Sequence, residues 1–335
     1  MGSLTHRRQD IERAKGLAIL FVVFGHIVAR ADPLQVEWYE PIRRAIYAFH
    51  MPFFLYLSGI VAVLSGALFT PPRSWLVLLR SRARRLLAPF LALGALTVAG
   101  KLIAAHFVFV DNQPASLASG LGDLLWHTAN SPALSIWYLF VLFFVSITAP
   151  ILVWAANGRL QCLLIVAFCI YFLPLPPVVY LDHIGKYAVF FGIGAWAAKQ
   201  GENWNAFVDR YWLCFLVILL CAVAAVGCFG AAWPVKAELL PIGIISMPAL
   251  HGLVRNSPVR FAPILLWLGR NSFMIYLFNT ICIGLAKGLL LRVTSWDGSH
   301  FLPFAMALMI SGSLGPILLK KTIFKQVILI GRHTN

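Results

Sequence analysis

Long apolar runs separated by short polar connections are the dominant pattern along this chain. Residues 136–156, 212–230 and 301–319 show it most clearly, because each holds almost no charged side chain. Apolar runs that approach ~20 residues are long enough to cross a bilayer as helices. The pattern therefore predicts an all-α, polytopic integral membrane protein.

About ten transmembrane helices are expected, with both termini in the cytoplasm. We predict them at 15–31, 46–68, 87–109, 136–156, 161–179, 184–199, 211–230, 239–254, 271–290 and 301–319. Prolines at 174, 176 and 177 break the apolar run between the fifth and sixth spans, so one re-entrant pair is an alternative there. The longest hydrophilic connections, about 110–135 and 200–210, are too short for a separate domain. Residues 1–335 are therefore predicted to form a single membrane domain.

The positions of the basic residues set the expected orientation. With the N-terminus inside, most of the 27 Lys and Arg residues fall in cytoplasmic segments, whereas Arg43, Arg44 and Lys236 fall outside or near outer ends of spans. This bias follows the positive-inside rule and favours an even number of spans. A multi-pass protein of the inner (plasma) membrane, in direct contact with the lipid bilayer, is the expectation.

Composition narrows the class of protein further. Hydrophobic residues make up 60% of the chain and charged residues only 12%, and the net charge is +15. On a soluble domain that charge would suggest nucleic-acid binding, but here the basic residues lie in short segments between apolar runs, so no nucleic-acid partner is expected. The six cysteines all lie inside apolar runs without paired zinc-ligand spacing, so no metal site is predicted.

The first span carries two candidate catalytic residues, Lys15 and His26. They are eleven positions apart, which places them on one helix face and ~16 Å apart along the axis. An ionisable residue within a membrane helix is a functional candidate, because it is costly unless it meets a partner or water. A neutral imidazole is suited to act as a general base near pH 7. The alternative is that His26 only hydrogen-bonds the loop that follows.

His50 is a third candidate, at the start of the string Phe49–Gly59. By the span count it lies near the outer surface, at a depth similar to that of His26, so the two histidines are candidates for one site. Pro52 suits the first turn of a helix, and Ser58–Gly59 offers a small surface for close helix approach. The alternative for His50 is a structural role at the start of the helix.

A basic run at residues 80–89 begins the third span. Its residues Arg82, Arg84 and Arg85 favour a topology signal that contacts anionic lipid. The alternative is a clamp for the phosphates of a nucleotide-bearing donor, because guanidinium pairs well with phosphate. No Gly-rich phosphate loop, zinc spacing or nucleophile elbow occurs elsewhere.

Together these segments resemble the acyltransferase-3 family of integral-membrane acyltransferases, and the first 60 residues look most like its fucose 4-O-acetyltransferase (nodulation-factor) type. Lys15 and His26 match the basic residue, ten-residue spacer and histidine of its first span. Phe49–Gly59 matches the second block, and Arg84–Pro89 matches the third. Weaker matches are Trp137–Leu139, Leu268–Ser272 and Ile275–Leu277.

The resemblance implies transfer of an acyl group, commonly acetyl from acetyl-CoA, to a hydroxyl of a polysaccharide, lipopolysaccharide or oligosaccharide. His26 would be the essential histidine and Lys15 its basic partner. In the resulting hypothesis Lys15, Arg82, Arg84 and Arg85 meet the phosphates of acyl-CoA, while the thioester reaches His26. This chain has Lys15 where many members have Arg, and Asn279 where many have His. The alternative function is a transporter or flippase of a lipid-linked glycan, with His26 and His50 lining its path.

Overall fold

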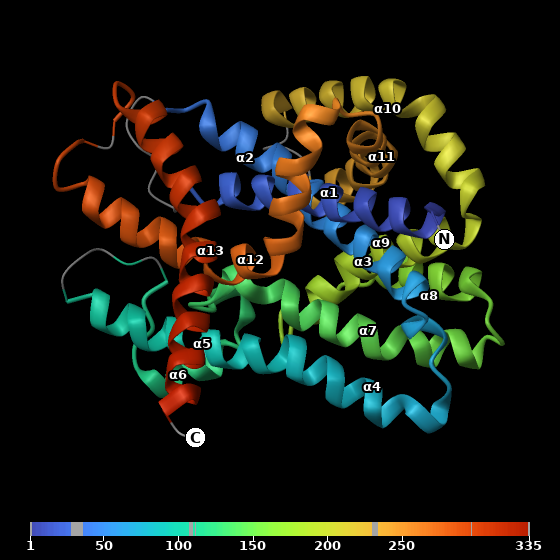
Figure 1. Ribbon diagram of the computed structural model, residues 1–335, viewed down its shortest axis with the longest axis horizontal. Coiled ribbons are helices and arrows are strands. Elements are labelled where there is room, and N and C mark those ends of the chain that lie inside the picture. The colour runs from blue at the N-terminus through green and yellow to red at the C-terminus, as the bar shows by residue number, and fades with distance from the viewer. Residues whose placement is uncertain are drawn as a thin grey trace. The chain divides into compact units, whose positions relative to one another are not determined.

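The computed structural model describes residues 2–27, 36–106, 110, 112–229, 234–295 and 297–333, with side chains from 9 to 322 (Figure 1). All the regular secondary-structure elements in these ranges are helices. The all-α prediction is therefore confirmed for the described part of the chain. The helices group into two compact units: unit 1 contains residues 1–50, 212–234 and 248–335, and unit 2 contains residues 51–211 and 235–247.

Unit 1 is built around a close crossing of two long helices. Its elements are α1 (Gly2–Gly25), α2 (Tyr39–Tyr47), the later parts of α10 (Glu202–Phe229) and α11 (Val235–Arg255), α12 (Ala262–Leu290) and α13 (Phe301–His333). Helix α12 packs against both α1 and α13. At the crossing, a Cβ on Gly269 would overlap the carbonyl oxygen of Glu12, and one on Gly16 would overlap that of Leu265. Two glycines therefore allow the backbones to touch.

Unit 2 holds the middle of the chain. Its helices are α3 (His50–Leu64, from Met51 onward), α4 (Trp75–Arg82), α5 (Ala88–Ala104), α6 (Leu117–Asp123), α7 (Trp137–Ala155), α8 (Leu160–Phe172), α9 (Leu181–Gln200) and the starts of α10 and α11. Short 3₁₀ turns lie at Ala67–Phe69, Pro72–Ser74, Thr128–Asn130 and Leu134–Ile136. Helix α8 packs on α9, and α7 contacts α4, α8 and α9. Gly59 of α3 lies against the carbonyl of Phe191 in α9, as expected for a small-residue surface.

Seven helices of the described chain are long and apolar enough to cross a membrane. They are Tyr39–Leu64, Pro72–Ala104, Leu134–Ala155, Glu202–Phe229, Val235–Arg255, Val259–Leu290 and Phe301–Thr322. Each overlaps one predicted span, so the protein is a multi-spanning membrane protein. The spans predicted at 15–31, 161–179 and 184–199 coincide with α1, α8 and α9, which are not among the seven. The total of ten and the cytoplasmic termini remain predictions, and residues 28–31, 107–109 and 230 of the predicted spans lie outside the described residues.

Two helices begin well before the apolar runs that predicted them. The second span was expected from residue 46 and the third from residue 87, but the helices start at Tyr39 and Pro72. The extensions carry polar side chains such as Glu40, Arg43 and Arg80, which lengthen a helix without lengthening its apolar run. Helix Pro72–Ala104 has 33 residues, or about 50 Å at the α-helical rise, which exceeds the ~30 Å hydrocarbon thickness. Its basic part therefore has room to project beyond the membrane core.

Candidate active site

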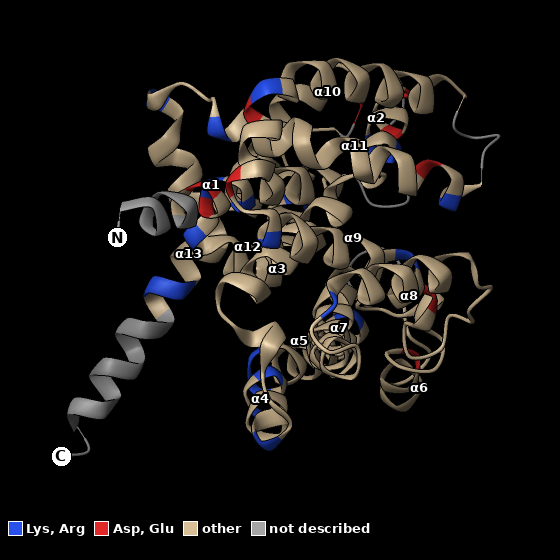
Figure 2. Cartoon of the chain, turned by 90° about the vertical axis from the view of Figure 1, so that its right-hand side faces the viewer, with Lys and Arg blue, Asp and Glu red and all other residues tan. Residues whose placement is uncertain are grey.

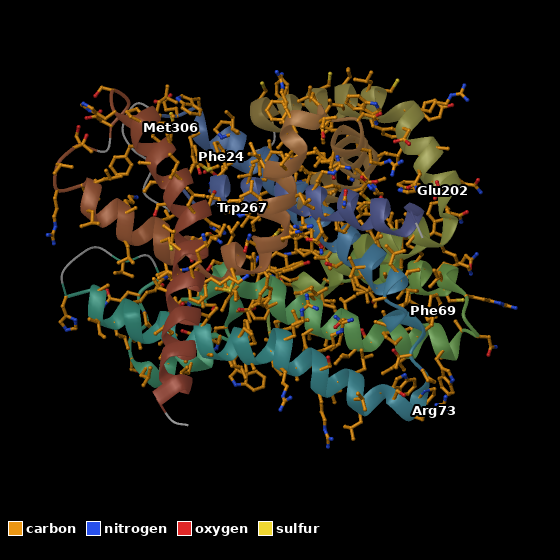
Figure 3. The ribbon with its side chains drawn as sticks, in the orientation of Figure 1. Phe24, Phe69, Arg73, Glu202, Trp267 and Met306 are labelled. Atoms are coloured by element: carbon orange, nitrogen blue, oxygen red, sulfur yellow. The ribbon has the colours of Figure 1, made fainter. Side chains whose placement is uncertain are left out.

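The end of α1 is held by two tyrosines from α2. The last carbonyls of a helix lack partners within it, and here Tyr39 donates its hydroxyl to Phe24 O at 2.5 Å and Tyr47 donates to Gly25 O at 2.9 Å. Figure 3 labels Phe24, whose ring lies 5.3 Å from that of Tyr39. A Cβ on Gly25 would meet the Tyr47 ring at 2.5 Å. The chain direction just before His26 is thereby fixed.

His50 has one nitrogen engaged and one nitrogen suited to accept a proton. Its ring is buried, with 6% of the residue exposed, and Nδ1 lies 2.8 Å from Ile46 O. A carbonyl only accepts, so Nδ1 carries the hydrogen and Nε2 keeps its lone pair. The predicted structural role of His50 and its predicted catalytic role are therefore compatible, because each uses a different nitrogen.

Three further side chains line up with His50 on one helical face. Glu40, Arg43, Tyr47 and His50 follow the three- and four-residue spacing of neighbours on a helix surface. Arg43 makes two 2.6 Å hydrogen bonds to Glu40, and its guanidinium carbon lies 5.1 Å from the centre of the Tyr47 ring. The Tyr47 ring is 4.9 Å from that of His50. The sequence analysis missed Arg43 and Tyr47, although this spacing was a signal that could have found them.

His26 joins this group immediately after α1. Arg43 and His50 both lie within electrostatic range of its ring. Among the residues that the structure describes, neither ring nitrogen of His26 has a hydrogen-bond partner. The loop at 28–35, which the alternative interpretation would pair with His26, lies outside the described residues. The structure thus brings together the two histidines that the span count placed at a similar depth, with one cation beside them.

Lys15 lies on α1 about three turns before His26, as the spacing requires. Its ammonium group pairs with Glu12 at 2.8 Å, and both side chains are partly exposed. One turn earlier, the buried Asp10 carboxylate binds Arg13 at 2.5 Å and Arg255 at 2.8 Å. The same end of α1 therefore gathers several cations in unit 1. Arg255 is 245 positions from Asp10 in the sequence, so no local sequence pattern predicts this ion pair.

The basic run of unit 2 lies on an irregular helical segment. Residues Ala83–Leu87 form a π-helical turn, η3, between α4 and α5, and such turns occur often at functional sites. Arg84 and Arg85 are exposed and Arg82 is half-buried. Within the described residues none of the three has a carboxylate partner. Figure 2 shows Lys and Arg positions, in blue, along the ribbon of α4. Unpaired guanidinium groups are available for an anionic ligand.

Several residues of the other family-like segments have structural roles. Gly269 makes the crossing with α1, and Ser58 exchanges a 2.8 Å hydrogen bond with the Tyr138 hydroxyl. Asn279 is 1% exposed and donates to the carbonyls of Ile275 and Tyr276 at 2.9 Å, while its side-chain oxygen has no partner in the described chain. No group of three or more His, Cys, Asp or Glu residues able to hold a metal ion occurs among the described residues.

Comparison with known proteins shows the family of the chain. The Acyltransferase domain family (Acyl_transf_3) matches residues 8–320, so the chain belongs to this family. Nodulation protein NolL of Mesorhizobium japonicum is 26% identical over 227 residues, which cover 67% of this chain and 56% of that protein. Nodulation protein NolL of Sinorhizobium fredii is 38% identical over 97 residues, or 28% of this chain and 25% of that protein. The chain thus spans about half the length of the first relative and less of the second. No solved structure matches the chain.

Proposed function

We propose that this protein is an O-acyltransferase of the inner membrane that moves an acyl group, acetyl in the first instance, from acetyl-CoA to a hydroxyl of a lipid-linked or cell-surface carbohydrate. Residues 1–335 act as one membrane domain. The observation that carries the proposal is that Tyr47 contacts His50, Arg43 and the residue just before His26 in unit 1, in a chain of the acyltransferase domain family.

The chemistry follows from the two imidazoles. A histidine nitrogen removes the proton of the acceptor hydroxyl as its oxygen attacks the thioester carbonyl carbon. The carbon–sulfur bond breaks, the CoA thiolate leaves, and the proton passes to it from the imidazolium. His26 takes the role of base and His50 supports it through Nε2. A relay in which His26 briefly carries the acyl group uses the same atoms in two steps. Arg43 is placed to stabilise negative charge that develops on the carbonyl oxygen.

The donor is proposed to approach from the cytoplasmic side. Lys15, Arg82, Arg84 and Arg85 are the cations proposed to meet its phosphates. The ~16 Å between Lys15 and His26 along the helix is comparable to the length of a pantetheine arm. One acyl-CoA would therefore be able to place its phosphates near Lys15 and its thioester near His26.

The test of the function compares surface and lipid-linked glycans by mass spectrometry. Cells are prepared with the wild-type protein, without it, and with the His26→Ala variant at matched membrane abundance. Loss of the acyl mass increment in both altered strains supports the acyltransferase and identifies the group. Unchanged acylation with accumulation of precursor glycan inside the cell favours the alternative transporter or flippase and contradicts the proposal.

Replacing Arg84 and Arg85 together with glutamine is expected to raise KM for acetyl-CoA at least tenfold, because each charge-assisted bond to phosphate contributes about 1.5–3 kcal/mol. Transfer from acetyl-pantetheine, which lacks the phosphates, is expected to change little. Initial rates with the purified protein measure both donors. Arg73→Gln is the control, since Arg73 is exposed at the start of the same continuous helix (Figure 3). Equal effects on the two donors would instead assign the run to topology and lipid contact.

A further inference from the structure

Helix α9 of unit 2 begins at a turn that its residues do not favour. Val179 and Tyr180 have φ values of 52° and 54°, the left-handed region that a β-branched residue rarely enters. Such strain persists only where surrounding contacts impose it, and it gathers at functional sites. Here Val179 donates its N–H to Leu125 O at 2.6 Å, and Thr128 donates its N–H to Pro177 O at 3.2 Å. The fully buried Thr128 adds a second hydrogen bond from its hydroxyl to the same carbonyl.

The strained turn sets where the first side chains of α9 lie. His183 and Tyr187 are one helical turn apart, and both rings pack against Trp137, the first residue of α7, with centroids 4.7 Å away in each case. The rings of His183 and Tyr187 are 6.1 Å apart and tilted by 32°. All three residues are only partly buried. They form an aromatic platform, defined here as Trp137, His183 and Tyr187, and each of the three residues keeps some exposed surface.

Charged groups lie directly beside the platform. Asp182 accepts hydrogen bonds from His183 Nδ1 at 2.9 Å and from Lys186 Nζ at 3.0 Å. Burial opposes the ionised carboxylate, but these two partners outweigh it and lower the pKa of Asp182 to about 2. Because the ionised Asp182 takes the Nδ1 hydrogen, Nε2 of His183 is left as an acceptor. In the described chain neither this Nε2 nor the indole N–H of Trp137 has a hydrogen-bond partner.

These features select a ligand with an apolar face and a polar rim. A pyranose ring presents C–H groups on its face, which carry partial positive charge and suit the negative face of an aromatic ring. Its hydroxyls would reach the His183 acceptor, the Trp137 donor and the Asp182–Lys186 pair around the platform. A phosphate or anionic lipid headgroup is less suited, because the ionised Asp182 carboxylate beside the platform would repel an anion. A role in packing alone would leave His183 Nε2 and the Trp137 indole N–H unused.

We propose that Trp137, Asp182, His183, Lys186 and Tyr187 form a binding site for one sugar ring of the carbohydrate acceptor. This site rests on the proposed function for its substrate class. By the predicted topology, the segments 110–135 and 179–184 both lie on the outer side of the membrane, where an exported or lipid-linked glycan is accessible. The residues of the site bind and orient the acceptor, and the acyl chemistry stays with the histidines of unit 1.

The test uses the full-length protein in lipid nanodiscs with acetyl-CoA and a panel of neutral methyl pyranosides. Two readouts are taken: acetyl transfer, giving KM for each substrate, and saturation-transfer difference NMR, giving glycoside binding without turnover. Trp137→Ala is expected to raise the acceptor KM about tenfold or more and to abolish the NMR signal, with KM for acetyl-CoA unchanged. Trp137→Phe should restore part of both, since it keeps an aromatic face and loses only the indole N–H.

The matched control is Trp126→Ala, because Trp126 is 60% exposed in the same unit. It should leave both readouts within about twofold of the wild type. If the Trp137→Ala protein transfers acetyl groups with an unchanged acceptor KM and an unchanged NMR signal, the proposed binding site is wrong. The proposed function would still stand. Binding that depends on Trp137 without any acetyl transfer by the wild type would support the site and defeat the proposed function. A wild type that neither binds nor modifies any glycoside would overturn both.

Discussion

Replacing His26 with alanine is expected to lower kcat for acyl transfer by about 10²–10⁴-fold, the range that a positioned general base contributes, and to leave the fold intact. The side chain stands just beyond α1 without a hydrogen-bond partner among the described residues, so its loss removes no recorded structural bond. Release of the CoA thiol, followed with purified protein and a carbohydrate acceptor, measures the effect. Size-exclusion profiles and thermal unfolding check the fold.

His106→Ala is the matched control for this experiment. His106 follows the end of α5 at an exposed position, with Nδ1 2.9 Å from Leu102 O. The His106→Ala protein should transfer acyl groups at the wild-type rate. His50→Asn separates the two roles of His50, because an asparagine amide is still able to donate to Ile46 O but carries no basic nitrogen. A folded His26→Ala protein with a normal kcat would refute both direct base catalysis and the acyl relay.

The sequence predicted the helical membrane fold, because runs of apolar residues indicate membrane helices. It also placed His26 and His50 at a similar depth by counting helical turns, and in the structure the two lie within electrostatic range of each other. It did not predict Arg43 and Tyr47, because they precede the apolar run and were assigned to a polar connection. Their three- and four-residue spacing before His50 was the available signal. The contact of Asp10 with Arg255 depends on how distant helices pack, and a single sequence holds no record of that packing.

The start of α9 shows a second limit of sequence-based prediction. Prolines 174, 176 and 177 marked a break between two spans, and the structure has a break there between α8 and α9. The left-handed turn at Val179 and Tyr180 runs against the propensity of both residues. Val179 donates its N–H to Leu125 O, and Thr128 donates its N–H to Pro177 O just before the turn, so contacts with a distant segment help to hold it. The aromatic platform depends on that turn, so the sequence patterns near Trp137 and His183 do not predict the platform.

Gly269→Ala is expected to destabilise the folded protein strongly, because a single methyl group there has no room. Its Cβ would overlap the carbonyl oxygen of Glu12, a backbone atom that cannot rotate away as a side chain can. Helix α1 must then shift from α12, at a cost of about 1–3 kcal/mol for overpacking, which corresponds to a Tm lower by on the order of 5 °C. Thermal unfolding of the purified protein, monitored by size-exclusion chromatography, measures the loss.

Gly288, in the same helix, provides the control, because alanine there is expected to raise the Tm or leave it unchanged. At Gly288 a Cβ would meet nothing within 4 Å, and alanine is a better helix former than glycine by about 1 kcal/mol, so Gly288→Ala should unfold at the wild-type temperature or above it. If both alanine variants shared one Tm, the close crossing of α1 and α12 would be wrong. Because α1 also carries Lys15 and leads directly to His26, a shift at Gly269 should lower acyl transfer in whatever protein remains folded, whereas Gly288→Ala should not.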